Sequence, residues 1–426
     1  MKSFHQIRKN TFSSIGISVI SLFFVSQQNL LRADEPLTLT QCYDLALKRS
    51  ESIAIQKELI KETEGRFLQS ISGIMPDVSY VYSDERQDGS GSTNFTLEQI
   101  PERKFTVTQP LFSGFKEFAA ISAGRAEKRQ RLEEEKRARQ LLFLDVADAF
   151  YFYLDYQEEI NTLETVATAL NERIEELNKR EELGRSRPSE TANAQLRLSR
   201  LEAELELVKS QKEVAEQLLE FLTGQSNLVL QDDDPLGQPF LELGEFLSKL
   251  SERPDIKAAA EALFIARKQI TRAKADFFPT VDLSGNYYTK RVGNSKDVTW
   301  DATLTIEAPI FLGTEIFGKV KEANAQAEQA RLILSEKKRS ATLEIQNAFT
   351  QWQANLRRSV ALEKAVNAAE KNYQLQKEDY QLNLVNNLTV LDALEELQST
   401  RREYIAVKNE TKRSYCKLKV AVGETE

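Results

Sequence analysis

The side chains that most often carry out catalysis or hold metal ions are rare or dispersed in this sequence. The only histidine among 426 residues is His5, so a histidine base or a histidine-ligated zinc site has no support in the rest of the chain. Neither a phosphate-binding Walker loop nor a G-x-G-x-x-G turn occurs, and no nucleotide site is predicted. The many carboxylates are spread at charge-pair spacing along helical faces. We therefore expect no enzymatic activity and no cofactor or metal site.

Two smaller groups of residues leave alternatives open. The acidic run 232–234 could bind a cation, but the adjacent Pro235 favours a turn-rich linker. Cys42 and Cys416 are the only cysteines, and they could be two thiols or a disulfide. A lipid anchor on Cys42 is the less favoured interpretation, because Gln41 before it is larger than the residue that a lipidation site requires.

The first 33 residues have the layout of a secretory signal peptide. Basic residues (Lys2, Arg8 and Lys9) precede an apolar run at about 15–25, and Ala33 supplies a cleavage site. Without this segment the formal charge changes from −8 to −12, which disfavours nucleic acid as a partner. No later segment contains the roughly 20 apolar residues of a transmembrane helix. Any part of the chain inside a bilayer would therefore have to consist of β-strands.

An internal duplication organises the chain. The motif Pro-Leu-Phe-Ser-Gly at 110–114 recurs as Pro-Ile-Phe-Leu-Gly at 309–313, and each copy reads helix, two strands, very long helix, sharp turn, return helix. The predicted organisation is a signal peptide over 1–33, a first repeat over 34–224, a linker over 225–250 and a second repeat over 251–426. We expect strands at about 77–110 and 280–308, long helices at about 114–184 and 313–383, and return helices at about 188–222 and 388–422.

The long helices are too long for a compact domain. Only Gly124 interrupts the stretch 114–184, which would measure about 105 Å at 1.5 Å per residue. Apolar residues of the return helix from Leu198 to Leu222 follow a heptad pattern broken only by Lys212. Such helices need neighbouring helices, and on their own they would indicate only a coiled coil.

The predicted strands alternate in a way that suits a membrane. In the second copy, apolar residues alternate with polar ones, and we expect the apolar ones to face lipid: Val281, Leu283, Tyr287, Val298, Trp300, Leu304 and Ile306. The first copy is weaker, and Pro101 should limit the reach of its second strand. An ordinary soluble hairpin is the alternative. Four strands cannot close a barrel in lipid, so self-association is required. A trimer would form twelve strands, although the count alone also permits a dimer or a tetramer.

Several motifs, in their order within the two copies, resemble the TolC-like outer-membrane efflux protein family. They are Leu-Thr-Leu at 37–39, Ala-Leu-Lys at 46–48, Pro76, Phe278-Pro279, the two strand exits at 110–114 and 309–313, and Val-Leu-Asp-Ala at 390–393. The resemblance covers essentially the whole mature chain. It implies a mainly α fold in which long antiparallel helices form a periplasmic α-barrel and four strands per chain enter a twelve-stranded β-barrel in outer-membrane lipid.

The same resemblance implies a function without catalysis. The homotrimer would export small molecules or polypeptides, as in efflux pumps and type I secretion, from an inner-membrane transporter and a periplasmic adaptor. The turns between the long and return helices would then be the tips that contact the adaptor: Gly184, Arg185, Arg187, Pro188, Ser189, Asn383, Asn386 and Asn387. The alternative is that each turn only joins two antiparallel helices and recognises no partner protein.

Acidic residues near these tips resemble the rings that narrow the tunnel mouth in the family. Asp392 matches an inner aspartate of the family by position, and Glu190 takes the acidic place in the first copy. We expect both to form a negative collar that favours cations, with solvated surface carboxylates as the alternative. Thr389 and Val385 replace an acidic and a basic residue found in some members, which puts the usual gating links in doubt.

The duplication also bears on the cysteines. Both map near the linker end of their repeats, and we predict a Cys42–Cys416 disulfide that ties the termini together. The main rival for the whole chain is a periplasmic coiled-coil adaptor or scaffold without a pore, and a secreted hydrolase is the enzymatic alternative. An adaptor has one helical hairpin and needs no lipid-facing strands, so both features count against it.

Overall fold

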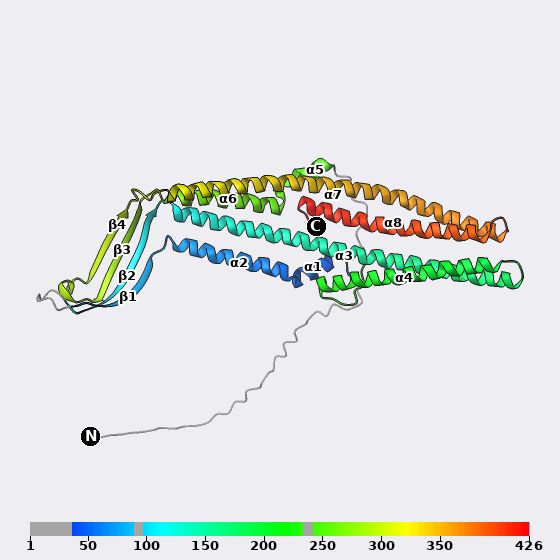
Figure 1. Ribbon diagram of the computed structural model, residues 1–426, viewed down its shortest axis with the longest axis horizontal. Helices are drawn as coiled ribbons and strands as arrows, with labels where there is room; N and C mark the ends of the chain where they lie inside the picture. Colours follow the sequence, from blue (N-terminus) through cyan, green and yellow to red (C-terminus); the bar gives the residue numbers. More distant parts are fainter. Residues whose placement is uncertain (1–35, 89–96, 233–241, 426) are drawn as a thin grey trace, which may run out of the picture.

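The computed structural model describes residues 36–88, 97–232 and 242–425, which form one elongated protomer with a small sheet at one end and helical hairpins at the other (Figure 1). The predicted signal peptide lies outside the described residues, as does most of the acidic run 232–234. The helices are α1 (Leu39–Arg49), α2 (Glu51–Ser72), α3 (Lys116–Glu182), α4 (Pro188–Thr223), α5 (Leu243–Ser248), α6 (Pro254–Ala275), α7 (Glu315–Gln381) and α8 (Asn387–Val422). The strands are β1 (Asp77–Arg86), β2 (Gln99–Ser113), β3 (Thr280–Lys290) and β4 (Trp300–Glu307).

The duplication is visible in the helix lengths. Helices α3 and α7 each contain 67 residues, which is about 100 Å at 1.5 Å per residue. The return helices α4 and α8 each contain 36 residues, and both end at a glycine in the left-handed conformation, Gly224 and Gly423. A glycine takes this conformation without the steric cost of a Cβ atom. The mainly helical fold class predicted from the sequence is confirmed.

Helix α3 lies at the centre of the protomer. Toward the sheet it packs against α2 and α6, and toward the tips it packs against α4 and α8, while α7 packs against α6 and α8 (Figure 1). An apolar cluster at mid-length, here called the central cluster, joins both repeats and includes Tyr43, Phe143, Phe150, Leu219 and Val420. Of the helices that the structure describes, none combines the length and the apolarity needed to cross a membrane.

The two cysteines are part of the central cluster, but they do not form the predicted disulfide. Cys42 and Cys416 are both buried there as thiols. Burial raises the pKa of the Cys42 thiol to about 12, so the reactive thiolate is disfavoured. The tie between the chain ends is therefore an apolar contact, since a buried cysteine packs as a small hydrophobic residue.

The sheet is fully antiparallel, with the order β1-β2-β3-β4. Two details differ from the sequence prediction. Val298 lies outside β4, which begins at Trp300 after the turn over 293–295. Strand β2 continues through Pro101, opposite Asp84 of β1. The proline is tolerated because the β2–β3 ladder ends at Arg103 opposite Lys290, so beyond that pair β2 has a neighbour on one side only.

Candidate functional site: the apolar sheet and the helical tips

One face of the sheet is apolar and exposed across all four strands. The register places four aromatic residues in a single row, here called the aromatic row: Tyr80 of β1, Phe105 of β2, Tyr287 of β3 and Trp300 of β4. All four are exposed, and Trp300 retains 67% of its accessible surface. Toward the helices the same face continues with exposed aliphatic residues: Val78, Val107, Leu283, Leu304 and Ile306. An aromatic border on an apolar band is typical of strands that meet lipid.

The opposite face of the sheet is polar and internally hydrogen-bonded. Thr106 Oγ1 lies 2.9 Å from Asn286 Oδ1, and Asn286 Nδ2 donates to Asp301 Oδ1 at 2.8 Å. Tyr288 donates its hydroxyl to the second oxygen of Asp301 at 2.7 Å. These contacts connect β2, β3 and β4 on one side, which is the arrangement expected for a face that lines a watery lumen.

A second set of aromatic residues gathers where the strands meet the helices. It consists of exposed phenylalanines: Phe115, Phe118, Phe277, Phe278, Phe311 and Phe317. Phe277 and Phe317 make an edge-to-face contact with ring centroids 5.5 Å apart. The sequence reasoning missed this set, although its members cluster around the duplicated strand exits. Together with the aromatic row it brackets the apolar strands at both ends, as girdles do in membrane barrels.

The helical tips are two sharp turns of matching geometry. Gly184 and Asn383 have φ angles of 68° and 55°, so both end their long helices in the left-handed conformation. Arg185, Arg187, Pro188 and Ser189 are exposed at the first tip, and Asn386 caps α8 by accepting from the backbone of Thr389 at 3.0 Å. Asn383 and Asn386 are exposed at the second tip.

Asn387, which the sequence placed among the tip residues for adaptor contact, is only 2% exposed. Its Oδ1 accepts from Arg173 Nε at 2.8 Å. Arg173 and Arg180 of α3 both lie over the ring of Tyr380 on α7, with distances to the centroid of 3.6 and 4.5 Å. Asn387 therefore belongs to a polar and aromatic contact that holds the two hairpins together near their tips.

The two acidic residues of the predicted collar have different surroundings. Glu190 accepts from Ser186 Oγ at 3.0 Å within its own turn. Asp392 accepts from Arg197 of α4 at 2.6 Å, and the same guanidinium contacts Glu395 at 2.6 Å. Each protomer thus places one cation among the acids of α8, so the field at Asp392 is weaker than that of an isolated carboxylate.

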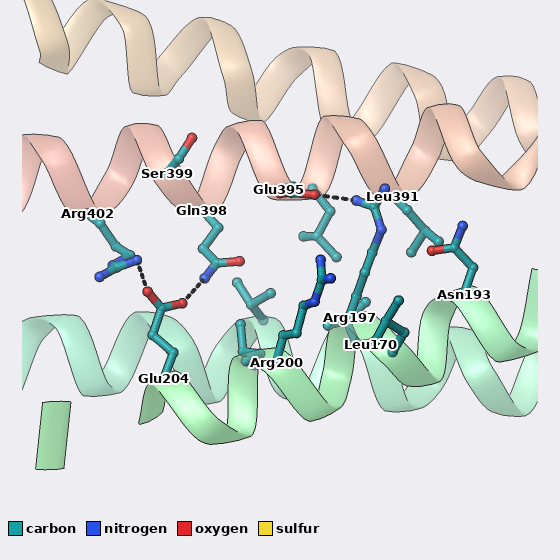
Figure 2. Close-up of a pocket in the computed structure, with 14 residues that line it drawn as sticks. Leu170, Asn193, Arg197, Arg200, Glu204, Leu391, Glu395, Gln398, Ser399 and Arg402 are labelled. Carbon is teal, nitrogen blue, oxygen red and sulfur yellow. Dashed lines mark hydrogen bonds and ion pairs between the residues drawn. The ribbon is translucent and has the colours of Figure 1, made fainter. Parts of the chain in front are cut away.

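Arg197 lies in a groove of about 430 Å³ between α4 and α8. Figure 2 shows that polar side chains from both helices extend into it beside apolar residues such as Leu170 and Leu391. Glu204 accepts from Arg402 and from Gln398 across the groove. Arg200 also lines the groove, and no acid in the described part of the chain lies within ion-pair distance of it. Arginine side chains therefore bridge α4 and α8 here, while α8 packs directly against α3.

The apolar strands, the polar sheet face and the hairpins built on helices about 100 Å long are the features of a membrane channel with a helical extension. The chain belongs to the outer membrane efflux protein family, which matches residues 42–225 and 248–424. The resemblance predicted from the motifs is confirmed. The protein is an outer-membrane channel that extends into the periplasm, and members of the family are transport channels, not enzymes.

Individual relatives agree with this assignment. The chain is 23% identical to the alkaline protease secretion protein AprF of Pseudomonas aeruginosa, over 92% of this chain and 86% of that protein. It is 24% identical to the outer membrane protein TolC of Vibrio cholerae over 68% of each. Among solved structures, VceC of Vibrio cholerae superposes with a TM-score of 0.81 at 21% identity, covering 91% of this chain and 97% of that one. The structural likeness shows the shared fold.

Proposed function

We propose that three copies of this chain close a twelve-stranded barrel and form a continuous export tunnel. The observation that carries the proposal is the sheet, whose apolar face is exposed. Its edge strands β1 and β4 each pair with one described strand only, β2 and β3, so the outer edge of each is left without a partner among the described residues. In lipid, unpaired strand edges cost several kcal/mol per unsatisfied group. Since β1 and β4 run antiparallel, β4 of one protomer can continue the antiparallel order with β1 of the next.

The proposed partners are an inner-membrane transporter and a periplasmic adaptor, which meet the channel at the helical tips. Family members work in such assemblies, and the exposed turn residues Arg185, Arg187 and Asn383 are positioned for contact. Relatives carry names that refer to protease secretion, cation efflux and solvent efflux. We propose that cargo delivered by the transporter, a small molecule or a polypeptide, passes through the tunnel without chemical change.

At the tunnel mouth we propose that Glu190 and Asp392 form a negative collar, three copies of each around the axis. The support is their common position one to two turns from the tips, on α4 and α8. Arg197 moderates this collar because it pairs with Asp392 and Glu395. The collar favours cations, since carboxylates that line a narrow pore lower the energy of a cation inside it.

The test of the proposed function is the oligomer mass of the mature protein, extracted from outer membranes in mild detergent, together with single-channel conductance in planar bilayers. A trimer with discrete conductance steps is expected. A monomer or dimer that does not conduct would overturn the barrel and revive the pore-free coiled-coil scaffold.

A further inference from the structure

Beyond the aromatic row, on the same face of the sheet, lies a short basic patch. The next residues in register are Tyr82 of β1, Arg103 of β2 and Lys290 of β3, with Tyr82 opposite Arg103 and Arg103 opposite Lys290. On β1 and β2 they lie two residues farther from the helices than the aromatic row, which is about 7 Å along a strand. On β3 the step from Tyr287 to Lys290 is three residues, because the register between β2 and β3 shifts between Lys104 and Arg103 and brings Lys290 opposite Arg103. Arg103 and Lys290 are both exposed, and the guanidinium carbon of Arg103 lies 5.3 Å from the centroid of the Tyr82 ring.

The basic patch differs from the cations on the other face of the same strands. There, Lys104 Nζ lies 2.9 Å from Glu102, and Arg291 Nε lies 3.5 Å from the second oxygen of Glu102. No acidic side chain in the described parts of the chain lies within ion-pair distance of Arg103 or Lys290. The polar face therefore neutralises its cations internally, whereas the lipid-side face presents two adjacent positive charges.

The position of this patch indicates what it meets. Tyrosine and tryptophan concentrate at the level of lipid headgroups, so residues just beyond the aromatic row lie among those headgroups. The helices extend into the periplasm, which places the hairpin ends of the strands in the outer leaflet. Arginine matches the geometry of a phosphate with two parallel hydrogen bonds, and lysine adds a point charge.

We propose that Arg103 and Lys290 form a binding site for a phosphate group on the headgroup of an outer-leaflet lipid. The proposal rests on the proposed function, because it needs the barrel to be inserted with this face toward lipid. Three such sites would surround each trimer. Tyr82 positions the guanidinium by holding it against an aromatic ring, a contact that a cation makes favourably.

The test uses purified full-length trimers and native mass spectrometry with lipid A carrying two phosphates as the probe. The double variant Arg103→Gln/Lys290→Gln is expected to bind the lipid about thirty-fold more weakly, since each cation near an anionic headgroup contributes about 1 kcal/mol. Lys104→Gln is the matched control from the other face of β2 and is expected to bind like the unaltered protein. Arg103→Lys keeps the charge and is expected to keep most of the binding.

Two further arms identify the source of the phosphate. Lipid A stripped of its phosphates is expected to bind weakly to every variant, and inorganic phosphate at millimolar concentration is expected not to displace the intact lipid. Equal binding of the two lipids, or displacement by inorganic phosphate, would overturn the proposal. So would unchanged lipid binding in the double variant.

Conductance of the same samples separates this inference from the proposed function. A conducting double variant with unchanged lipid binding refutes the lipid site and leaves the channel standing, whereas absence of conducting trimers in the unaltered protein refutes the channel itself. If the double variant does not assemble, Lys290→Gln alone is measured, with an expected weakening of about fivefold.

Discussion

At the scale of single residues, the charge of the proposed collar depends on one arginine that contacts two acids. Arg197 lies between Asp392 and Glu395 and leaves this group with one net negative charge per protomer. Asp392 is 59% exposed in its side chain, so the pair stabilises the fold little. In the proposed collar its consequence is electrostatic, because Arg197 would partly cancel the field that the acids of α8 exert on an ion in the pore.

Arg197→Gln is therefore expected to raise the cation preference of the open channel by about two- to threefold at low salt, because three positive charges leave the mouth. Asp392→Asn should lower it by a similar factor. The measurement is the reversal potential in a salt gradient across a planar bilayer. Arg331→Gln, at an exposed arginine in the half of α7 toward the sheet, is the control for arginine removal as such. Unchanged selectivity in Asp392→Asn would remove Asp392 from the collar.

Cys42 supports a prediction about reactivity and pH. Burial raises its pKa to about 12, so the thiol stays protonated in the folded protein when an unfolded cysteine, with a pKa near 9, would ionise. Its contribution to stability is complete below about pH 9 and is lost as the pH rises toward 12. At pH 8 a maleimide should label neither cysteine of the native trimer and both cysteines after denaturation without reductant. Failure to label the denatured chain would show a disulfide after all.

At the scale of the elements, the sheet shows how two faces of one strand come to have opposite roles. Side chains alternate with a period of two, so the register that aligns Tyr80, Phe105, Tyr287 and Trp300 also aligns Thr106, Asn286 and Asp301 on the other side. A slip of one residue would reverse both faces. The hydrogen bonds of Asn286 and Asp301 oppose such a slip, because they form only in this register.

Neighbouring residues of β4 offer a matched test of which face meets lipid. Leu304→Arg places a charge on the apolar face and should cost about 2–4 kcal/mol near the middle of the bilayer, whereas Thr303→Arg on the polar face should cost little. The fraction of each variant that assembles into heat-resistant trimers in outer-membrane preparations provides the measurement. Equal assembly of the two variants would contradict the assignment of the faces.

At the scale of the whole molecule, a buried arginine near mid-length holds distant parts of the second repeat together. Arg253, only 1% exposed, contacts Asp255 beside it and Glu344 of α7, and it donates to the carbonyl of Ala421 in α8. Burial by itself would raise the pKa of Asp255, but the hydrogen bonds and charge of Arg253 lower it below its usual value. One side chain thus connects the start of the second repeat with its two long helices.

Arg253→Met is expected to destabilise the protein by about 3–5 kcal/mol, because it leaves two acids without their buried partner. Urea or thermal unfolding of the detergent-solubilised trimer measures the loss. Part of it should disappear at low pH, since the contribution of Asp255 is present above its unfolded pKa of about 3.8 and is lost as the pH falls below it. Arg358→Met, which removes an exposed pair with Glu403, is the control and should cost less than about 1 kcal/mol. Equal losses in both variants would refute the role of Arg253.

The sequence by itself determined the elements and their order. Helix and strand periodicity are local properties, and the duplication and the apolar alternation of β3 were both readable without a partner segment. The family followed from the same motifs. The start of β4 could not be read from the sequence, because Val298 fits the alternation and only pairing decides where a strand begins.

The tertiary structure alone decided which distant residues meet. Arg197 with Asp392, and Arg173 with Tyr380 and Asn387, are pairs from different hairpins, and no local pattern indicates them. The burial of Asn387 and the absence of a bond between Cys42 and Cys416 depend likewise on how the helices pack around α3. The physical reason is that secondary structure follows from neighbours along the chain, whereas ion pairs, burial and the aromatic row follow from the rotation and register of elements about 200 residues apart.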